Sequence, residues 1–194
     1  MVGSINANPM VPWLQNKAAN TYTQFGEDGL IAACLERIGE TNRQCFEVGA
    51  ADGLFFSNTL RLREQGWSAV LIESDPILFG KLDDTYGNTA ICIHATATDL
   101  DNQIPSEFSR TPDLGVIDID GQDYWLWNDM VDIRPRIMLV EIFPRNDNEP
   151  IPKQGGRGQA GLNPIRKLGE DMGYTLVATT LCNALFIDSE ILNA

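Results

Sequence analysis

The stretch CFEVGAADG at residues 45–53 decides the fold, because a buried apolar run changes there into a turn of small side chains. Residues 45–48 have the composition of a short strand that is buried on both faces. The turn that follows contains only Gly, Ala and Asp, so its backbone can approach a ligand closely. A segment with helical spacing comes next, at residues 57–65. A strand, a tight turn and a helix in this order are typical of open α/β sheets, in which ligands bind beyond the carboxyl ends of the strands.

Further apolar runs extend this pattern along the chain, with helical segments between them. The predicted strands cover residues 45–48, 68–74, 89–98, 114–120, 136–144, 174–180 and 184–188, and the predicted helices cover 30–38, 57–65, 76–86, 124–130 and 162–172. The first five strands alternate with helices, which indicates a parallel sheet that is covered on both faces. Residues 181–183 are too few for a helical crossover, so the last two strands must form an antiparallel hairpin. We therefore predict an α/β fold with a mostly parallel seven-stranded sheet and a terminal antiparallel hairpin.

Length and composition indicate one ordinary globular domain. The chain has 194 residues, of which 43% are hydrophobic and 21% are charged. The polar residues 1–20 are expected to form a loosely held N-terminal arm, and residues 21–194 a single domain. The formal net charge of −13 argues against a nucleic-acid partner, because phosphate binding needs clustered Lys and Arg. No run approaches the length needed to cross a membrane, and the start has no signal pattern, so we expect a cytoplasmic protein without a membrane partner.

The cysteines and the single histidine give no sign of a metal site. Cys34, Cys45, Cys92 and Cys182 are scattered without a C-x-x-C pair, and we expect free thiols. With one histidine, a Cys/His zinc site is not expected. His94, near the end of the third strand, is either a general base or a structural residue, and the sequence favours the structural role.

Two signals at the ends of the first two strands favour a ligand with an adenosyl group. Glu73 ends the second strand, 24 residues beyond Gly49, and an acid there can accept hydrogen bonds from both ribose hydroxyls. Each signal alone has a plainer interpretation, a tight turn or a solvated acid, but their order and spacing together favour the ligand. The turn is not the dinucleotide fingerprint, because G-x-G-x-x-G would need glycines where Ala51 and Leu54 stand.

Several motifs occur together along residues 22–188 and make the sequence recognisable. They are Q-F-G-E-D at 24–28, F-E-V-G-A-A-D-G at 46–53, S-N-T at 57–59, L-I-E-S-D-P at 71–76, I-D-I-D-G-Q-D-Y-W at 117–125, P-R-I-M-L-V-E at 135–141 and N-A-L-F at 183–186. With these motifs the sequence resembles the FkbM-like family of S-adenosylmethionine-dependent methyltransferases, many of which are O-methyltransferases. The resemblance implies a Rossmann-like class I methyltransferase sandwich with S-adenosylmethionine as its cofactor.

The resemblance also implies a set of cofactor-binding residues, which lie before the first helix and at the ends of the first four strands. Those beside the methionine portion, the ribose and the adenine come from different strands. The set comprises Gln24 and Asp28 flanking the cofactor, Glu47 and Gly49 at the methionine side, Glu73 at the ribose, Asp99 at the adenine, and also Asp52 and Asp118.

Four acids gather at the ends of the fourth and fifth strands: Asp118, Asp120, Asp123 and Glu141. Like charges packed this closely raise each other's pKa or recruit a cation. Methyl transfer requires that the acceptor is aligned and loses its proton, so we predict Asp118, Asp120 and Glu141 as catalytic residues, with Asp123 auxiliary. The same three catalytic acids could hold Mg²⁺ beside a hydroxyl acceptor. In the plainer interpretation, Asp123 caps the following helix and Asp120 faces solvent.

Residues 145–161 form a long segment that is either a lid or a disordered loop. Its basic residues, Arg145, Lys153 and Arg157, are compatible with an anionic acceptor or a sugar phosphate. The expected partner is a small-molecule or carbohydrate acceptor, and a homo-oligomer could complete an open site.

Two other functions remain compatible with the residues. One is a cofactor-binding module that has no transfer activity, and the other is a nicotinamide-dependent oxidoreductase on a similar fold. The missing third glycine, the terminal hairpin and the lack of a Tyr-x-x-x-Lys pair disfavour the oxidoreductase. The leading hypothesis is therefore an S-adenosylmethionine-dependent O-methyltransferase that acts on a small-molecule or sugar hydroxyl.

Overall fold

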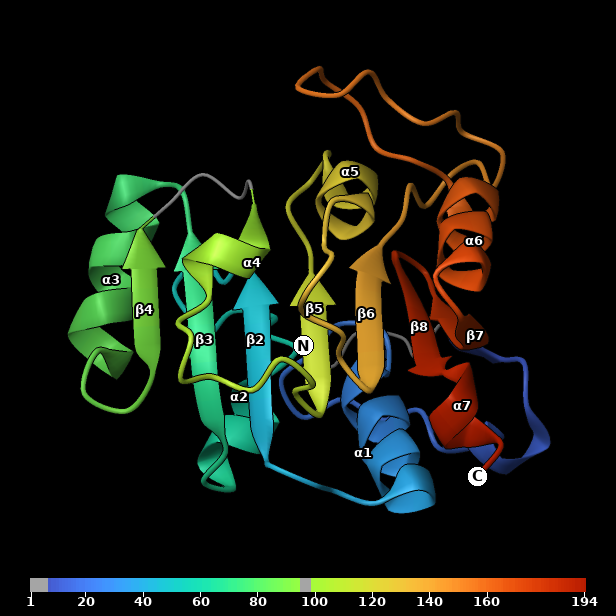
Figure 1. The fold of residues 1–194 in the computed structure, drawn as a ribbon, viewed down its shortest axis with the longest axis horizontal. Helices are drawn as coiled ribbons and strands as arrows, with labels where there is room; N and C mark the ends of the chain where they lie inside the picture. Colours follow the sequence, from blue (N-terminus) through green and yellow to red (C-terminus); the bar gives the residue numbers. More distant parts are fainter. Residues whose placement is uncertain (1–6, 95–98) are drawn as a thin grey trace.

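The central sheet determines where a ligand can bind. The computed structural model describes residues 7–94 and 99–194 (Figure 1). Within these residues, eight strands form one sheet in the order β1-β7-β8-β6-β5-β2-β3-β4. The strands are β1 Ala7–Pro9, β2 Gln44–Val48, β3 Ser68–Glu73, β4 Ile91–His94, β5 Leu114–Ile117, β6 Ile137–Glu141, β7 Tyr174–Thr180 and β8 Asn183–Asp188.

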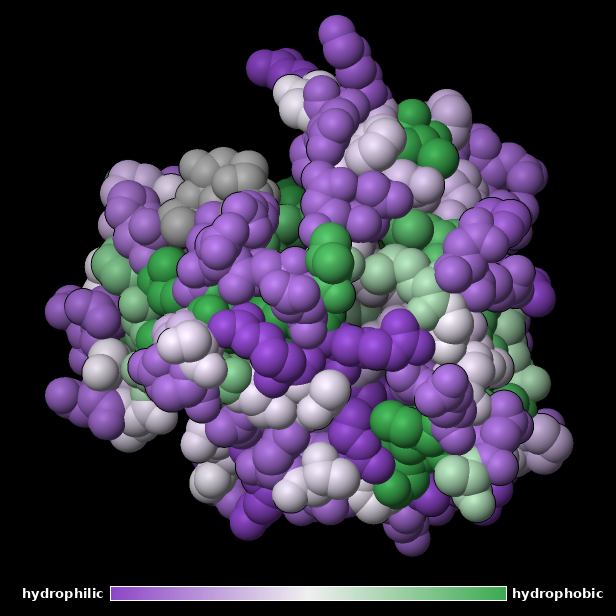
Figure 2. All heavy atoms as spheres, in the orientation of Figure 1, coloured by the Kyte–Doolittle hydropathy of each residue, from purple (hydrophilic) through white to green (hydrophobic). Residues whose placement is uncertain are grey.

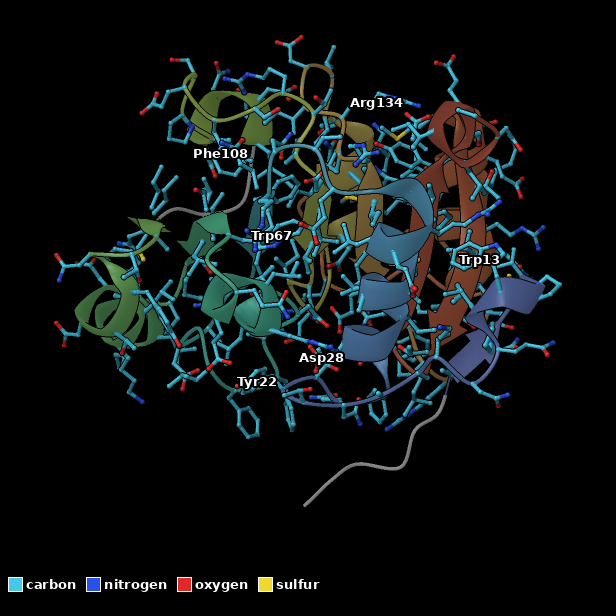
Figure 3. All side chains as sticks on the ribbon, turned by 90° about the horizontal axis from the view of Figure 1, so that it is seen from below. Trp13, Tyr22, Asp28, Trp67, Phe108 and Arg134 are labelled. Carbon is cyan, nitrogen blue, oxygen red and sulfur yellow. The ribbon has the colours of Figure 1, made fainter. Side chains whose placement is uncertain are left out.

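Helices cover both faces of the sheet, so the molecule has three layers (Figure 3). They are the 3-10 helix η1 Pro12–Leu14 and the α-helices α1 Glu27–Ile38, α2 Leu60–Glu64, α3 Pro76–Tyr86, α4 Leu100–Gln103, α5 Asp123–Asn128, α6 Leu162–Asp171 and α7 Ser189–Leu192. Successive strand residues face opposite sides of a sheet, and Cys45 and Phe46 of β2 accordingly belong to different core clusters. Helices α1, α2 and α3 pack on the Cys45 face, where Leu30 is buried. Helices α4, α5 and α6 pack on the Phe46 face, where Trp127 is buried.

The topology places a crevice beside the first long strand. Strands β2 to β6 are parallel to one another. Strand β8 is antiparallel to both β6 and β7. The chain moves outward from β2 through β3 to β4, and then returns to β5 on the other side of β2. Strand order therefore reverses between β2 and β5, and the carboxyl ends of these strands flank the usual ligand position of open α/β sheets. The predicted α/β fold and terminal hairpin are confirmed.

The sheet has one strand more than the seven predicted. Strand β1 lies within the N-terminal arm and pairs antiparallel with β7, with Ala7 opposite Thr180. Leu14 of the arm is fully buried, and η1 contacts α1. A three-residue strand that ends in proline is too short to produce an alternating pattern, so the sequence carries no signal for it. The arm is attached to the domain more closely, from residue 7 onward, than its polar composition indicates.

Smaller differences concern the ends of elements. The helix predicted at 57–65 is limited to α2, because the hydroxyl groups before it bind Glu47 instead of continuing the helical pattern. The connection between β4 and β5 contains the short helix α4, for which the sequence pattern gives no signal. The strand predicted at 89–98 is observed as β4, and residues 95–98 lie outside the described part of the chain.

None of the helices in residues 7–94 and 99–194 has the length and apolar character of a membrane span. The four cysteines are free, as expected. Cys34 and Cys45 are buried in the core, whereas Cys92 and Cys182 are half-buried.

Candidate functional site

Two adjoining cavities lie at the carboxyl ends of the central strands. The larger has a volume of about 410 Å³ and the smaller a volume of about 270 Å³. Gly49, Asp118 and Asp120 line both, so the cavities meet at the point where strand order reverses. Glu47 lines only the larger cavity and Glu73 only the smaller. The structure thus brings predicted site residues from four strands together in one crevice.

Gly49 is required by the close approach of the chain after β2 to the chain after β5. Its φ is +82°, and a Cβ atom at this position would lie 1.8 Å from the backbone oxygen of Asp118. Its N–H donates a hydrogen bond to the carbonyl oxygen of Ile72 at 3.0 Å. Only glycine fits here, and the floor of the crevice is therefore backbone that a ligand can approach without meeting a side chain.

Glu47 is bound by the segment that leads into α2. Its carboxylate accepts hydrogen bonds from Ser57 Oγ at 2.7 Å, from the Asn58 N–H at 2.7 Å and from Thr59 Oγ1 at 2.6 Å. These donors are the S-N-T motif of the sequence, so the motif serves the buried carboxylate at the end of β2. Glu47 consequently lines the larger cavity and also fixes the loop that closes it.

Glu73 holds the turn on the other side of the crevice. One carboxylate oxygen accepts from the Ala51 N–H at 2.7 Å, and the other accepts from Ser74 N–H at 2.8 Å and Asp75 N–H at 2.7 Å. Ala51 has a φ of +49°, a conformation that is uncommon for residues other than glycine, and the bond from Glu73 supports it. A carboxylate has about four acceptor positions, so Glu73 can accept a further hydrogen bond from a ligand in the smaller cavity.

The Q-F-G-E-D motif forms one wall of the larger cavity. Gln24 lines this cavity, whereas Asp28 lines neither cavity. Asp28 Oδ2 instead accepts hydrogen bonds from the backbone N–H groups of Thr21 at 2.7 Å, Tyr22 at 2.7 Å and Thr23 at 3.0 Å, at the start of α1 (Figure 3). Asp28 therefore acts on the crevice by fixing the loop that contains Gln24.

Asp52 and Asp99, both predicted to bind the cofactor, line neither cavity. Asp52 Oδ1 accepts from the N–H groups of Leu54 and Phe55 at 3.0 and 2.9 Å, and these bonds hold the pKa of Asp52 below its usual range. Asp99 is exposed, and its Oδ2 accepts from Asn102 Nδ2 at 2.7 Å. Both side chains stabilise turns at the rim of the site.

Asp118 and Glu141 are neighbouring carboxyl groups that both line the larger cavity, with Glu141 buried and Asp118 half-buried. Burial and the charges of Asp123 and Glu47 raise the pKa of Asp118 to about 7. A hydrogen bond with Glu141 partly offsets this rise. Burial and the charges of Asp118 and Asp123 raise the pKa of Glu141 to about 9. Glu141 Oε2 also accepts the N–H of Asp120 at 2.8 Å. At neutral pH the pair therefore retains a proton that isolated carboxylates would have lost.

Asp120 is exposed, as in its plainer interpretation, whereas Asp123 does not cap the following helix, because Gln122 stands at the N-cap of α5 and no side chain caps it. Asp123 is buried, and its oxygens accept the N–H groups of Ile119 at 2.9 Å and Gly121 at 3.0 Å, while burial raises its pKa to about 6. It thus fixes the turn before α5. Asp120 is exposed at the rim of both cavities with a φ of +56°.

The structure does not support the predicted Mg²⁺ site. Among residues 7–94 and 99–194, no group of three or more His, Cys, Asp or Glu side chains is arranged to hold a metal ion. Glu141, one of the three acids predicted to hold Mg²⁺, accepts the backbone N–H of Asp120. Sequence spacing places acids at neighbouring strand ends, but it does not show which of their oxygens are already bound.

Glu27 is a site residue that sequence reasoning missed. Its carboxylate accepts from the Phe25 N–H at 2.8 Å, from Thr180 Oγ1 at 2.6 Å and from Asn183 Nδ2 at 3.3 Å. One buried carboxylate therefore joins the wall before α1 to the turn between β7 and β8. Its position inside the Q-F-G-E-D motif was the only available signal.

Two aromatic residues at the mouth of the larger cavity were also missed. Phe55 and Phe56 line it, as does Leu181 in the hairpin turn. Their side chains are exposed, although they are large and apolar. The signal was three consecutive apolar residues, 54–56, in a loop between Gly53 and Ser57.

The segment 145–161 lies over α5 at the top of Figure 1 and is a largely hydrophilic protrusion in Figure 2. Trp125 Nε1 donates to the carbonyl oxygen of Pro152 at 2.7 Å, and Gln122 exchanges hydrogen bonds with Gly155 and Gly156. The segment is therefore held against α5 rather than disordered. Its three basic side chains are exposed, and they line neither cavity: Arg145, Lys153 and Arg157.

His94 occupies the structural role that the sequence favoured. Its Nε2 lies 3.1 Å from the carbonyl oxygen of Ser74, and its ring stacks on Phe79 with 4.9 Å between centroids. These contacts join the end of β4 to the loop after β3.

Solved structures of methyltransferases share this architecture. No protein-family model and no curated protein matches the chain. The chain is similar to a precorrin-6y C5,15-methyltransferase from Geobacter metallireducens GS-15, with a TM-score of 0.52 and 12% identity over 87% of this chain and 92% of that one. It is also similar to a fibrillarin pre-rRNA processing protein from Methanococcus jannaschii, with a TM-score of 0.57 and 14% identity over 79% of this chain and 69% of that one. An O-methyltransferase family protein from Burkholderia thailandensis gives a TM-score of 0.55 and 11% identity over 84% of this chain and 59% of that one.

At these identities the likeness shows the fold, which is the Rossmann-like class I methyltransferase fold. The chain spans only 61% and 59% of the length of two of the structures that it matches. The predicted fold class is confirmed. The FkbM-like family, the cofactor and the acceptor stay predictions.

Proposed function

We propose that this protein is an S-adenosylmethionine-dependent methyltransferase of the FkbM-like type, which methylates a hydroxyl group of a small molecule or a sugar. The observation that carries the proposal is the charge of the crevice. Its lining includes five acids, and no Lys or Arg of the described residues lines either cavity. The acids are Glu47, Glu73, Asp118, Asp120 and Glu141. Since S-adenosylmethionine carries a sulfonium and an ammonium cation, an acidic crevice on a methyltransferase fold favours this cofactor.

The same charge disfavours a nicotinamide dinucleotide. A dinucleotide brings a pyrophosphate, which α/β folds bind at a glycine-rich turn and a helix N-terminus. Here Ala51 and Leu54 stand where two of the fingerprint glycines would be. Carboxylates line the crevice beside this turn. Repulsion from Glu47 and Asp118 would oppose an anionic ligand at this position.

The geometry of the two cavities supports the cofactor-binding assignments. Glu73 in the smaller cavity has acceptor capacity left for ribose hydroxyls, because its known donors are three backbone N–H groups. The bare backbone at Gly49 and the carboxylate of Glu47 suit the cationic methionine end. We place the adenosyl group in the smaller cavity, and the methionine end together with the acceptor in the larger one.

The carboxyl pair gives the site a proton acceptor. When bound, S-adenosylmethionine supplies a methyl group on a positively charged sulfur, which keeps the electron pair of the broken S–C bond as a neutral thioether. The acceptor oxygen forms the new C–O bond and must lose its proton. Asp118 and Glu141 are suited to take this proton, because their raised pKa brings their basicity closer to working pH than that of exposed acids.

Isothermal calorimetry with S-adenosylmethionine and S-adenosylhomocysteine tests the cofactor. We expect both to bind the wild-type protein with micromolar affinity. Glu73→Ala should weaken binding roughly 10- to 100-fold, the magnitude of lost hydrogen bonds to a charged group. Glu107→Ala is the matched control, because Glu107 is exposed and lines neither cavity. Circular dichroism of each variant verifies that it is folded.

The outcomes separate the remaining hypotheses. If a folded wild-type protein binds neither ligand, the methyltransferase proposal is wrong and the likeness is one of fold alone. If both ligands bind but no hydroxylated compound in a broad panel yields S-adenosylhomocysteine, the protein is a cofactor-binding module. Binding of NAD in place of both would establish the oxidoreductase.

A further inference from the structure

Two phenylalanines are exposed at the mouth of the larger cavity. Phe55 is 70% exposed and Phe56 is 41% exposed. Their ring centroids lie 3.8 Å apart with the planes tilted by 46°. Burying a side chain of this size in the core would stabilise the fold by about 1.5–3 kcal/mol, so these rings contribute little to stability where they are. Adjacent exposed apolar groups at a cavity mouth are typical of a binding surface.

The loop that contains both rings is fixed from three sides. Glu47 accepts hydrogen bonds from the segment directly after it, at residues 57–59. Arg63 donates to the carbonyl oxygen of Gly53 and, at 3.0 Å, to Ser57 Oγ. Asp52 Oδ1 accepts the N–H groups of residues 54 and 55. The rings are therefore presented by a rigid loop rather than by a flexible one.

The backbone of Phe56 is strained. Its φ of +59° lies in the left-handed region, which costs about 1–2 kcal/mol for a residue with a Cβ atom. Strain of this kind persists where the surroundings dictate it, and it clusters at functional sites. Gly53 and Gly49 in the same loop use glycine for positive φ, whereas at position 56 the chain keeps an aromatic ring despite the cost.

Further apolar side chains line the larger cavity, beside its acids and the polar groups of Gln24 and Asn58. Phe25, Pro144 and Leu181 also line it, and Leu181 is 41% exposed. Asp118 and Glu141 line it from the strand ends. The basic side chains of segment 145–161 line neither cavity. An acceptor in this cavity would therefore contact aromatic and aliphatic groups with its body and carboxyl groups with its reacting end.

We propose that the acceptor is an uncharged phenol or aryl alcohol, whose ring stacks on Phe55 and Phe56 while its hydroxyl group reaches Asp118 and Glu141. This inference rests on the proposed function and adds the substrate class to it. Stacked and edge-to-face aromatic contacts supply affinity beyond the buried area. A phosphate or carboxylate on the acceptor would meet the acids of this cavity without a cation to pair with.

The test measures methyl transfer with 2-naphthol, methyl α-glucoside and 6-hydroxy-2-naphthoate, which has the same aryl hydroxyl and an added carboxylate, by formation of S-adenosylhomocysteine. We expect turnover of 2-naphthol with a KM at least roughly tenfold below that of the glucoside, and no turnover of 6-hydroxy-2-naphthoate. The double variant Phe55→Ala/Phe56→Ala should raise the KM for 2-naphthol about tenfold and change kcat much less. Ile77→Ala is the matched control, because Ile77 is an exposed apolar residue on α3 that lines neither cavity.

A second variant separates binding from folding. Phe56→Gly removes a ring and also relieves the positive φ, so its Tm should equal or exceed that of the wild type while its KM for 2-naphthol rises. Calorimetry with S-adenosylhomocysteine is run on every variant and should give unchanged affinity.

The results discriminate the inference from the proposed function. Normal cofactor binding overturns the acceptor class and leaves the methyltransferase proposal intact in two cases. In the first, the glucoside or 6-hydroxy-2-naphthoate is turned over in preference to 2-naphthol. In the second, the KM for 2-naphthol is the same in the wild type and in the Phe55→Ala/Phe56→Ala variant. Absence of cofactor binding by the folded wild-type protein overturns both.

Discussion

The two ends of strands β5 and β6 hold buried charges in opposite ways. At the amino ends, Asp113 precedes β5 and Arg136 precedes β6, and they form an ion pair with 2.8 Å between Oδ1 and Nη1. At the carboxyl ends, Asp118 follows β5 and Glu141 ends β6, and both are acids. The same two strands therefore carry a complementary pair at one end and a repulsive pair at the other.

The amino-end pair is fully satisfied. Asp113 also accepts hydrogen bonds from Thr41, Asn42 and Arg43, within 3.1 Å. Burial alone would raise the pKa of Asp113, but the hydrogen bonds from Thr41 and Arg136 hold it below the usual range. Arg136 in turn donates to the carbonyl oxygens of residues 38 and 39 at the end of α1. The charges at this end of the sheet therefore stabilise the fold, because each has partners for its polar atoms.

The carboxyl-end pair shows the reverse. No Lys or Arg of the described residues lines the cavities beside Asp118 and Glu141, and the pKa of each is raised by burial and by like charge. Such an arrangement lowers stability and increases basicity, which is the usual compromise at sites of chemistry. The contrast teaches that the two ends of the same parallel strands can differ in charge pairing, with an acid paired to a cation at the amino end and two acids together at the carboxyl end.

The largest expected effect concerns the amino end. Arg136→Met should lower the free energy of unfolding by about 3–5 kcal/mol, because it leaves Asp113 buried without its cation. Urea denaturation measures the loss. Arg166→Met is the control, since Arg166 pairs with Glu170 on an exposed helix surface, where such pairs contribute about 0–1 kcal/mol. If the two variants lost equal amounts of unfolding free energy, the inference that the buried Asp113–Arg136 pair stabilises the fold would be contradicted.

The next effect concerns the carboxyl end. Asp118→Asn should reduce kcat for methyl transfer roughly 10²- to 10⁴-fold at saturating cofactor, because it removes half of the proton-accepting pair. Steady-state kinetics on an accepted alcohol measure it, with Asp84→Asn as the control, since Asp84 is exposed on α3. A variant with wild-type kcat would remove Asp118 from the chemistry.

The smallest effect has the opposite sign, because removing a repulsive charge should stabilise the protein. The pKa of Glu141 is raised in the folded state, so the unfolded chain releases this proton at a lower pH than the folded protein does. The contribution of the Glu141 carboxyl group to stability is therefore complete at low pH and is lost as pH rises toward the raised pKa. In Glu141→Gln the side chain does not titrate, so this loss does not occur. The Tm of this variant should exceed that of the wild type by a few degrees at pH 8.5, at about 2–4 °C per kcal/mol, and the excess should shrink toward pH 5. A difference in Tm that does not depend on pH would show that Glu141 has the same pKa in the folded and unfolded states, which would contradict the raised pKa.

The sequence predicted the framework of the site because strand ends can be located from apolar runs alone. Gly49, Glu73, Asp118 and Glu141 each end or directly follow a buried run, and parallel strands bring such positions to one edge. The hairpin was equally predictable, since the link between β7 and β8 is too short for a helix. These inferences depend only on the positions of apolar runs and the lengths of the links between them, which can be read directly from the sequence.

What the sequence could not provide is the partner of each polar atom. Asp28 and Asp52 were predicted to bind the cofactor and Asp123 was left with two interpretations, and the structure shows that all three accept backbone N–H groups of their own loops. Such contacts depend on loop conformations with positive φ, as at Phe56 and Asp120, for which residues other than glycine give no signal. The aromatic mouth of the cavity follows from those same loops.

Strand β1 has a consequence for how the molecule behaves at high concentration. An uncovered sheet edge offers a row of free N–H and C=O groups on which a second chain can add a strand and begin an aggregate. Ala7–Pro9 occupies that edge on β7 and presents in its place a strand of only three residues, ended by a proline without an N–H. The short strand β1 thus leaves fewer free backbone groups at this edge than the longer strand β7 would leave.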